Sequence, residues 1–264
     1  MPVPLYVVDA FTDRPFAGNP AAVCPLDGPM PEDWLRNVAM EMNLSETAFV
    51  WPEGDGYRLR WLTPAVEVDL CGHATLAASH VMWETGRVPA GRTIRFETRS
   101  GMLTAEPRDG LIELDFPARP AALGPIDQTV ADALGTNPAA YGLNGMDAFV
   151  VVASEAEVRR LRPDFRQLGT VGVRGVIVTA EADAGKPYDF VSRFFAPGSG
   201  IDEDPVTGSA HCCLAPYWGE RLGKTEMTGY QASKRGGMVR VRLAGNRVKL
   251  GGTAVTMTRG ELLV

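Results

Sequence analysis

Short runs of apolar and β-branched residues, separated by turn-forming residues, dominate the first half of the chain. Runs of this length, bounded by Gly, Pro, Asn, Asp or Ser, are typical of β-strands. Residues 16–25 include Gly18, Asn19 and two prolines, so this stretch is predicted to be a loop with a short apolar piece. The predicted strands are residues 3–8, 45–51, 56–62, 93–97, 102–106 and 111–115.

Two segments of the first half have helical patterns instead. In residues 31–43 the apolar side chains of Trp34, Leu35, Val38 and Met42 fall on one face, which indicates an amphipathic helix. Residues 74–84 are small and mostly apolar, and Gly86 follows them. This second helix is therefore predicted to be buried and to end near that glycine.

The second half repeats this mixture of strands and one apolar helix. Residues 116–126 contain three prolines and a glycine, so they are the best candidate for a linker. We therefore predict two halves, residues 1–118 and 119–264, with a last strand that either stays in the second half or returns to the first. The elements predicted for the second half are strands near residues 148–153, 173–179 and 189–195, a helix over 209–222, and strands to the C-terminus.

Strands and helices do not alternate regularly, which argues against a TIM barrel or a doubly wound sheet. The pattern favours an α+β fold with one buried helix in each half.

An internal repeat relates the two halves. Arg60 and Arg193 are 133 residues apart, and so are Asp69 and Asp202 (193 − 60 and 202 − 69). Downstream of the aspartate, each half has a turn of small residues at which a helix begins. In the second half, three extra residues separate the aspartate from this turn. Chance similarity of two strand–turn–helix units is the alternative, but the shared order favours duplication. The turns are Cys71-Gly72-His73-Ala74 and Thr207-Gly208-Ser209-Ala210.

The two helix starts are candidates for binding an anion. Glycine lets backbone N–H groups approach a ligand closely, and the first turn of a helix has unpaired N–H groups and a partial positive charge. Two such starts, at Gly72 and Gly208, could hold a carboxylate. The plainer interpretation is ordinary helix entry with only water bound.

Several polar residues near these starts could carry chemistry. His73 at a helix N-terminus is predicted to stay neutral, which suits a proton shuttle, although it could also be a simple capping residue. Ser209 can donate and accept, and can act as an N-cap. Asp204 ends an acidic run from Asp202 that could equally be a solvated or cation-binding loop. Glu46 is predicted to lie on a strand, on the same face as Leu44 and Ala48. A carboxylate there suits general acid/base chemistry, although Glu46 taken alone is better interpreted as a surface residue.

Composition narrows the functional classes further. The net charge is −6 with no basic cluster, so nothing predicts nucleic-acid binding. The four cysteines show no disulfide spacing, and the histidines and cysteines form no recognised metal motif. No apolar run is long enough to span a membrane, and the N-terminus does not resemble a signal peptide. A cytoplasmic location is the default expectation.

Five segments, spread over most of the chain and in family order, resemble the PhzF-like family of phenazine biosynthesis. They are Val8-Asp9-Ala10-Phe11-Thr12, Phe16-Ala17-Gly18-Asn19-Pro20-Ala21, Asn43-Leu44-Ser45-Glu46-Thr47, Leu70-Cys71-Gly72-His73-Ala74-Thr75 and Asp202-Glu203-Asp204-Pro205-Val206-Thr207-Gly208-Ser209-Ala210-His211.

The resemblance implies the diaminopimelate epimerase-like fold: two pseudo-symmetric halves, each a curved, barrel-like sheet around a central helix, with the active site in the cleft between them. It also implies a homodimer that isomerises a small carboxylate-bearing substrate without metal or cofactor, as the best-known member does with dihydro-hydroxyanthranilate. By this resemblance the catalytic residues are Glu46, His73, Asp204 and Ser209, and the substrate-binding candidates are Asn19, Ser45, Cys71, Gly72, Thr207 and Gly208.

Three functional hypotheses remain open at this point. The first is a proton-shifting isomerase with Glu46 as acid/base. The second is a racemase or epimerase of an amino-acid-like substrate that uses Cys71 as a base, although the matching position in the second half is Thr207 and not a second cysteine. The third is a non-catalytic protein that binds a small ligand on the same fold.

Overall fold

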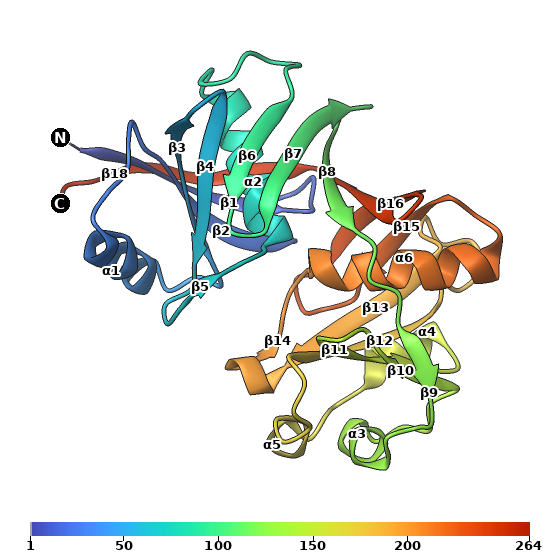
Figure 1. Ribbon diagram of the computed structural model, residues 1–264. Helices are drawn as coiled ribbons and strands as arrows, with labels where there is room; N and C mark the ends of the chain where they lie inside the picture. Colours follow the sequence, from blue (N-terminus) through green and yellow to red (C-terminus); the bar gives the residue numbers. More distant parts are fainter. Residues whose placement is uncertain (1) are drawn as a thin grey trace. The chain divides into compact units, whose positions relative to one another are not determined.

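The computed structural model describes residues 2–264, which form two compact units (Figure 1). The first unit runs to Phe116 and also contains Gly251–Val264, and the second unit is Pro117–Leu250. The chain therefore divides two residues before the predicted boundary, and its C-terminal strand belongs to the first unit. Within residues 2–264, every helix is too short or too polar to cross a bilayer.

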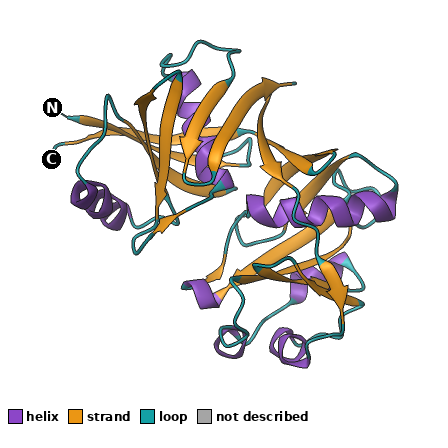
Figure 2. Ribbon diagram, viewed as in Figure 1, coloured by secondary structure: helices purple, strands orange, loops and turns teal. Residues whose placement is uncertain are grey.

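The first unit is mainly β-structure, as Figure 2 shows for the chain as a whole. Its helices are α1 (Glu32–Met42) and α2 (Gly72–Glu84). Its strands are β1 (Val3–Ala10), β2 (Asn19–Pro25), β3 (Thr47–Glu53), β4 (Gly56–Leu62), β5 (Glu67–Val68), β6 (Ile94–Thr98), β7 (Gly101–Arg108), β8 (Leu111–Pro117) and β18 (Ala254–Leu262).

These strands form one continuous series of pairs. β1 lies between β18 and β2 and is antiparallel to both. β2 pairs in parallel with β3, β3 is antiparallel to β4, and β4 pairs in parallel with β6. β6, β7 and β8 continue as an antiparallel meander, and the short β5 folds back onto β4.

Helix α2 is the centre of the first unit because it has no polar face. Its buried residues lie on every side of the helix, so it needs cover on every side, and it packs against β1, β2, β3 and β18. Ala74, Ala77 and Ala78 are small enough for strands to pack close to the helix. Helix α1 is amphipathic, as predicted, and buries Leu35, Val38 and Ala39.

The prediction of a loop over residues 16–25 was wrong, because β2 starts at Asn19. Its two prolines occupy the second and last positions of the strand, so the lost N–H donors do not fall in its middle, and residues 21–25 are buried. The chain enters β2 through Gly18, whose φ is +65°. A Cβ there would lie 2.1 Å from the Ala10 carbonyl oxygen, so the turn needs glycine.

The second unit has more helix than the sequence pattern predicted. Its helices are α3 (Gln128–Leu134), α4 (Glu155–Arg160), α5 (Phe165–Leu168), the 3₁₀-helix η1 (Pro197–Ser199) and α6 (Gly208–Leu222). Its strands are β9 (Ala122–Gly124), β10 (Ala140–Leu143), β11 (Asp147–Val151), β12 (Gly175–Glu181), β13 (Phe190–Ala196), β14 (Ile201–Glu203), β15 (Glu226–Gln231), β16 (Gly237–Ala244) and β17 (Arg247–Gly252).

The second unit repeats the pairing pattern of the first. β10 lies between β9 and β11, antiparallel to both, just as β1 lies between β18 and β2. β11–β12 is parallel, β12–β13 antiparallel, β13–β15 parallel and β15–β16 antiparallel. β14 folds back onto β13 as β5 does onto β4. The fold is therefore a mixed α+β fold with an internal duplication, in which α6 is the counterpart of α2.

A bidentate arginine–glutamate pair precedes each central helix. Arg60 donates from Nε to Glu67 Oε1 at 2.8 Å and from Nη2 to Oε2. Arg193 donates to Glu203 through the same atoms at 2.7 and 2.9 Å. We call these two pairs the Arg–Glu clamps. Each glutamate stands five residues before the helix glycine, Gly72 or Gly208 (72 − 67 and 208 − 203).

The clamps correct the alignment of the repeat. Glu67 follows Arg60 by seven residues, whereas Glu203 follows Arg193 by ten. The three extra residues therefore lie in the turn before the glutamate, and the structural match is Glu67 with Glu203. The match of Asp69 with Asp202 proposed from spacing was wrong, because it placed the insertion after the aspartate.

Replacing Arg193 by Met is expected to lower the free energy of unfolding by about 3 kcal/mol, measured by urea denaturation. Arg193 is buried, and it also donates to the carbonyls of Val158 and Leu161, so its loss leaves several partners unpaired. Arg36→Met is the control: Arg36 forms an exposed pair with Glu32, and its loss should cost less than about 1 kcal/mol. Equal losses in both variants would contradict the role of the clamp.

Candidate active site

Glu46 lies in a turn directly before β3 and not on the strand itself. Helix α1 ends at Met42, its C-cap Asn43 adopts a left-handed conformation with φ of 49°, and the strand starts only at Thr47. The prediction that Glu46 shares a strand face with Leu44 and Ala48 was therefore wrong. The Ala22 N–H donates to the Glu46 carbonyl at 3.2 Å, which fixes the backbone of Glu46 to β2. Ser45 is half-buried in the same turn.

His73 is the second residue of α2 and is buried. The helix begins at Gly72, and Cys71 is its N-cap in an extended conformation. Thr75 Oγ1 donates to the carbonyl of Cys71, which secures the first turn. No side chain caps this helix start within residues 2–264. That the first-turn N–H groups bind a ligand stays a prediction.

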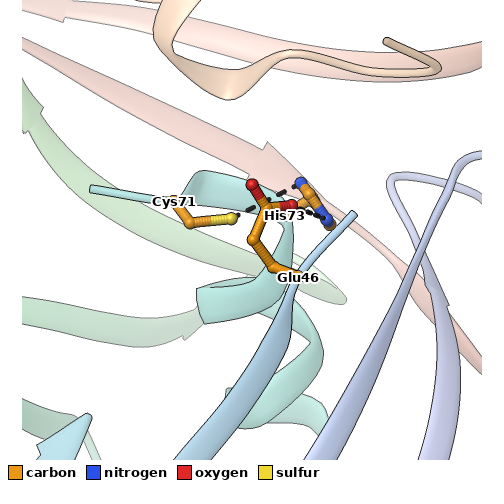
Figure 3. A group of neighbouring side chains, drawn as sticks. All are labelled: Glu46, Cys71 and His73. Carbon is orange, nitrogen blue, oxygen red and sulfur yellow. Dashed lines mark hydrogen bonds and ion pairs between the residues drawn. The ribbon is translucent and has the colours of Figure 1, made fainter. Parts of the chain in front are cut away.

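The side chains of Glu46, Cys71 and Asn19 all reach the imidazole of His73. Glu46 Oε2 lies 3.2 Å from His73 Nε2, and Cys71 Sγ lies 3.6 Å from Nδ1. Figure 3 shows the Glu46 and Cys71 side chains pointing toward the ring. The Asn19 side-chain amide nitrogen is 3.2 Å from Nδ1. A protonated Nδ1 can only donate in this contact and an unprotonated Nδ1 can only accept, so the roles of the two groups follow the protonation of the ring.

His73 favours the charged state, contrary to the prediction that it stays neutral. Burial by itself lowers the pKa of His73, but the neighbouring Cys71 and Glu46 more than offset burial, so the pKa lies well above its usual value. Burial raises the pKa of the Cys71 thiol, and the charge of Glu46 adds to this effect. Cys71 is the larger of the two neighbouring influences on the pKa of His73, and Glu46, whose carboxylate faces Nε2, is the second.

The approach of Glu46 to His73 is a charge contact and not an aligned hydrogen bond. Within residues 2–264, neither Glu46 Oε2 nor His73 Nε2 has a hydrogen bond of good geometry, although both atoms are buried. Buried polar atoms are normally hydrogen-bonded.

Glu46, Cys71 and His73 also contain three potential metal-ligating atoms within 4.8 Å of one another. The two ring nitrogens of His73 have lone pairs that diverge, however, and Cys71 contacts one nitrogen whereas Glu46 contacts the other. The contacts of Cys71 and Glu46 with different ring nitrogens are also compatible with proton transfer along the ring.

In the second unit, Asp204 and Thr207 form a network at the start of α6. Thr207 is the N-cap of the helix and its Oγ1 donates to Asp204 Oδ2. Gln231, which is fully buried at the end of β15, receives the Thr207 N–H at 2.8 Å and donates to the Asp204 carbonyl at 2.8 Å. The turn from Asp204 to Gly208 is thereby fixed to the sheet.

Ser209 belongs to a separate network and is not an N-cap, contrary to the prediction. It is the second residue of α6, and its Oγ accepts from Arg174 Nη2 at 2.9 Å. Arg174 in turn donates to Asp147 from Nε at 2.8 Å and from Nη2 at 2.6 Å. Reasoning from the sequence missed Gln231, Arg174 and Asp147, because all three are distant in sequence from the helix start that they contact.

The structure thus brings together Glu46, Cys71, His73 and Asn19 in the first unit, and Asp204 with Thr207 in the second. It also places Gly72 and Gly208 as the first residues of α2 and α6. That these residues bind substrate stays a prediction.

Comparison with known proteins identifies the class and the family. The fold is related to that of epimerases: a hydroxyproline epimerase from Agrobacterium vitis, solved with trans-4-hydroxy-L-proline, matches 99% of this chain and 92% of its own with a TM-score of 0.63, at 13% identity. At that identity the likeness concerns the fold alone.

Matches of higher identity place the chain in one family. The family model described as phenazine biosynthesis-like protein matches residues 8–260. A protein of Halalkalibacterium halodurans named an uncharacterized isomerase is 51% identical over 265 residues, with 100% of both chains covered. The crystal structure of a PhzF-family phenazine biosynthesis protein from Enterococcus faecalis matches 100% of both chains with a TM-score of 0.95 and 45% identity. The chain therefore belongs to the PhzF family of phenazine biosynthesis-like proteins.

Replacing Glu46 by Gln is expected to lower the pKa of His73, because the imidazolium loses its counter-charge. Nuclear magnetic resonance titration of the three histidines measures this directly. In the unmodified protein, His73 should be the histidine that is protonated at neutral pH, since burial lowers the pKa of His80 and lowers that of His211 to about 4.

Glu84→Gln is the matched control, because Glu84 lies 3.9 Å from His80 and should affect that histidine only. A His73 titration curve that is the same with and without the Glu46 carboxylate would contradict the assigned pairing.

Proposed function

We propose that the protein is an isomerase that moves a proton on a small carboxylate-bearing substrate, with Glu46 as the general acid/base. The observation that carries this proposal is the buried contact of 3.2 Å between Glu46 Oε2 and His73 Nε2, in which both atoms keep unused hydrogen-bonding capacity. Membership of the PhzF family, whose relatives are named isomerases, supports it.

The proton moves without any change in oxidation state. The Glu46 carboxylate takes a proton from one carbon, the C–H electron pair forms a new double bond as the neighbouring double bond shifts, and Glu46 returns the proton to a second carbon. The positive charge of His73 stabilises negative charge that develops on the substrate during the transfer. Atoms and electrons balance within the substrate, so this step consumes no co-reactant.

The helix starts are the proposed positions for the substrate carboxylate. Three shorter helices, α3, α4 and α5, are capped by the side chains of Asp127, Ser154 and Asp164. The N-caps Cys71 and Thr207 of the two central helices provide no such cap. The first-turn N–H groups of each helix can therefore bind carboxylate oxygens. At the start of α6 the Ser209 hydroxyl is a further donor, whereas the Asp204 carboxylate can only accept from a donor group of the substrate. A homodimer and a cytoplasmic location stay predictions.

The alternative of an epimerase with Cys71 as its base is not favoured. The base would have to be a thiolate, but burial raises the pKa of Cys71 and Glu46 adds to that effect. The residue that corresponds to Cys71 at the start of α6 is Thr207, so a symmetric pair of thiols is absent from the two helix starts.

Deuterium uptake from heavy water tests the proposal. The substrates are dihydro-hydroxyanthranilate and a panel of cyclic and amino-acid-like acids, and incorporation at carbon is measured by mass spectrometry. Glu46→Gln should reduce the exchange rate by about 10³-fold, because the amide cannot accept the proton. Glu41→Gln, an exposed glutamate of α1, is the control and should exchange at the rate of the unmodified protein.

Exchange that survives in the Glu46→Gln variant would overturn the role of Glu46. Absence of exchange with every acid, together with calorimetry that detects a bound ligand, would instead favour a non-catalytic binding protein.

Cys71→Ser distinguishes the two enzymatic hypotheses. Serine keeps a small polar side chain at the helix N-cap but cannot supply a thiolate. The exchange rate should fall by less than about tenfold, because only a weak contact with His73 is changed. A loss as large as that of Glu46→Gln would make the thiol the base and would contradict the proposal.

A further inference from the structure

Arg174 occupies the same place in the second unit as Glu46 does in the first. Glu46 directly precedes β3 and contacts His73, the second residue of α2. Arg174 directly precedes β12, the counterpart of β3, and contacts Ser209, the second residue of α6. The duplicated fold has therefore placed the same type of contact, from the residue before a strand to the second residue of the central helix, in both units.

Two side chains fix the orientation of the Arg174 guanidinium, one along the edge of its plane and one against its face. Asp147, which is almost fully buried, receives two hydrogen bonds from it along one edge. The Phe194 ring lies against its face at 5.4 Å. Phe194 is fixed in turn because it packs onto Gly175, where a Cβ would lie 2.3 Å from the ring. The nitrogen that reaches Ser209 is thus set by the fold.

This contact determines the direction in which the Ser209 hydroxyl can act. A guanidinium has N–H donors and no acceptor, so Ser209 Oγ must accept from Arg174. The hydroxyl hydrogen therefore points to another partner, which makes Ser209 a donor. A donor at the first turn of α6, next to N–H groups that no N-cap side chain occupies, complements an oxygen acceptor such as a carboxylate.

We infer that Arg174, held by Asp147, is a positioning residue that fixes Ser209 as a hydrogen-bond donor to the substrate carboxylate. This inference rests on the proposed function, because it takes the carboxylate of the proposed substrate as the acceptor. Arg174 acts through Ser209, so its contribution to binding exists only while the serine hydroxyl is present.

The test is a double-mutant cycle on ligand binding that does not depend on turnover. Calorimetry measures the binding of anthranilate, a small cyclic carboxylate, to the unmodified protein, Arg174→Lys, Ser209→Ala and the double variant. Lysine keeps the positive charge opposite the buried Asp147, so the variant is expected to fold, which thermal unfolding verifies. Lysine lacks the planar fork that reaches both partners.

Each single variant should bind anthranilate about tenfold more weakly, and the double variant no more weakly than Ser209→Ala alone. Aniline, which lacks the carboxylate, should not distinguish the variants. Arg159→Lys is the matched control and should bind like the unmodified protein. Arg159 makes the same three kinds of contact as Arg174. It pairs with the almost fully buried carboxylate of Glu155 and lies over the Tyr230 ring at 5.2 Å. Its Nη2 also donates to the Tyr188 hydroxyl at 2.9 Å.

Additive losses in the cycle would overturn the inference, because Arg174 would then act on the ligand directly. Unchanged binding in Arg174→Lys, or no binding of anthranilate to the unmodified protein, would overturn it as well. Failure of the proposed function has a different outcome. Deuterium exchange would then be absent, while the losses of anthranilate binding in the double-mutant cycle would still be non-additive.

Discussion

Burial of two central helices, most of whose residues are covered by their sheets, is the constraint on which both units depend. A helix that is apolar all round is stable in water only when it is covered on every side. In the first unit the strands β1, β2, β3 and β18 pack on α2. In the second unit, Tyr217 of α6 packs edge-on against Phe149 of the sheet. Trp218 of the same helix stacks on Phe190. The start of each helix is therefore fixed by the whole unit, and this suits a catalytic group that must be held rigidly.

The duplicated frame holds different chemistry in its two copies. Cys71 and Thr207 are the N-caps of α2 and α6, and His73 and Ser209 are the second residues of these helices. In the first unit the residue before the strand is an acid that faces a buried histidine, which makes a pair able to hold and move a proton. In the second unit it is an arginine facing a serine, and this pair can donate hydrogen bonds but cannot accept a proton at neutral pH. On the function proposed above, the first copy carries proton transfer and the second carries recognition.

Sequence patterns predicted most of the strands, helix α1, both central helices and their glycine starts, because these depend on local periodicity and on backbone freedom at one residue. The fold class and the family resemblance were confirmed. Strand β2 was missed because its prolines look like turn residues until the pairing with β1 is known. The strand position of Glu46 was wrong because the left-handed Asn43 delays the strand, which no periodicity reveals.

Charge and contact across the fold were the least predictable features. The helix dipole was taken to keep His73 neutral, but Cys71 and then Glu46, which is 27 residues away in sequence (73 − 46), raise the pKa of His73. Arg174, Asp147 and Gln231 look like ordinary polar residues along the chain. Their roles arise only from the pairing of strands that bring them to the start of α6.

The Arg–Glu clamps have a consequence for how such chains change in length. Each clamp closes the base of a surface turn, so the turn between Pro64 and Glu67, or between Pro197 and Glu203, can lengthen without moving the helix that follows. The three-residue difference between the two copies shows that one such change has already been accommodated. These turns are therefore suitable places to insert a foreign peptide, such as an epitope or a fluorescent label, while the register of both central helices is kept.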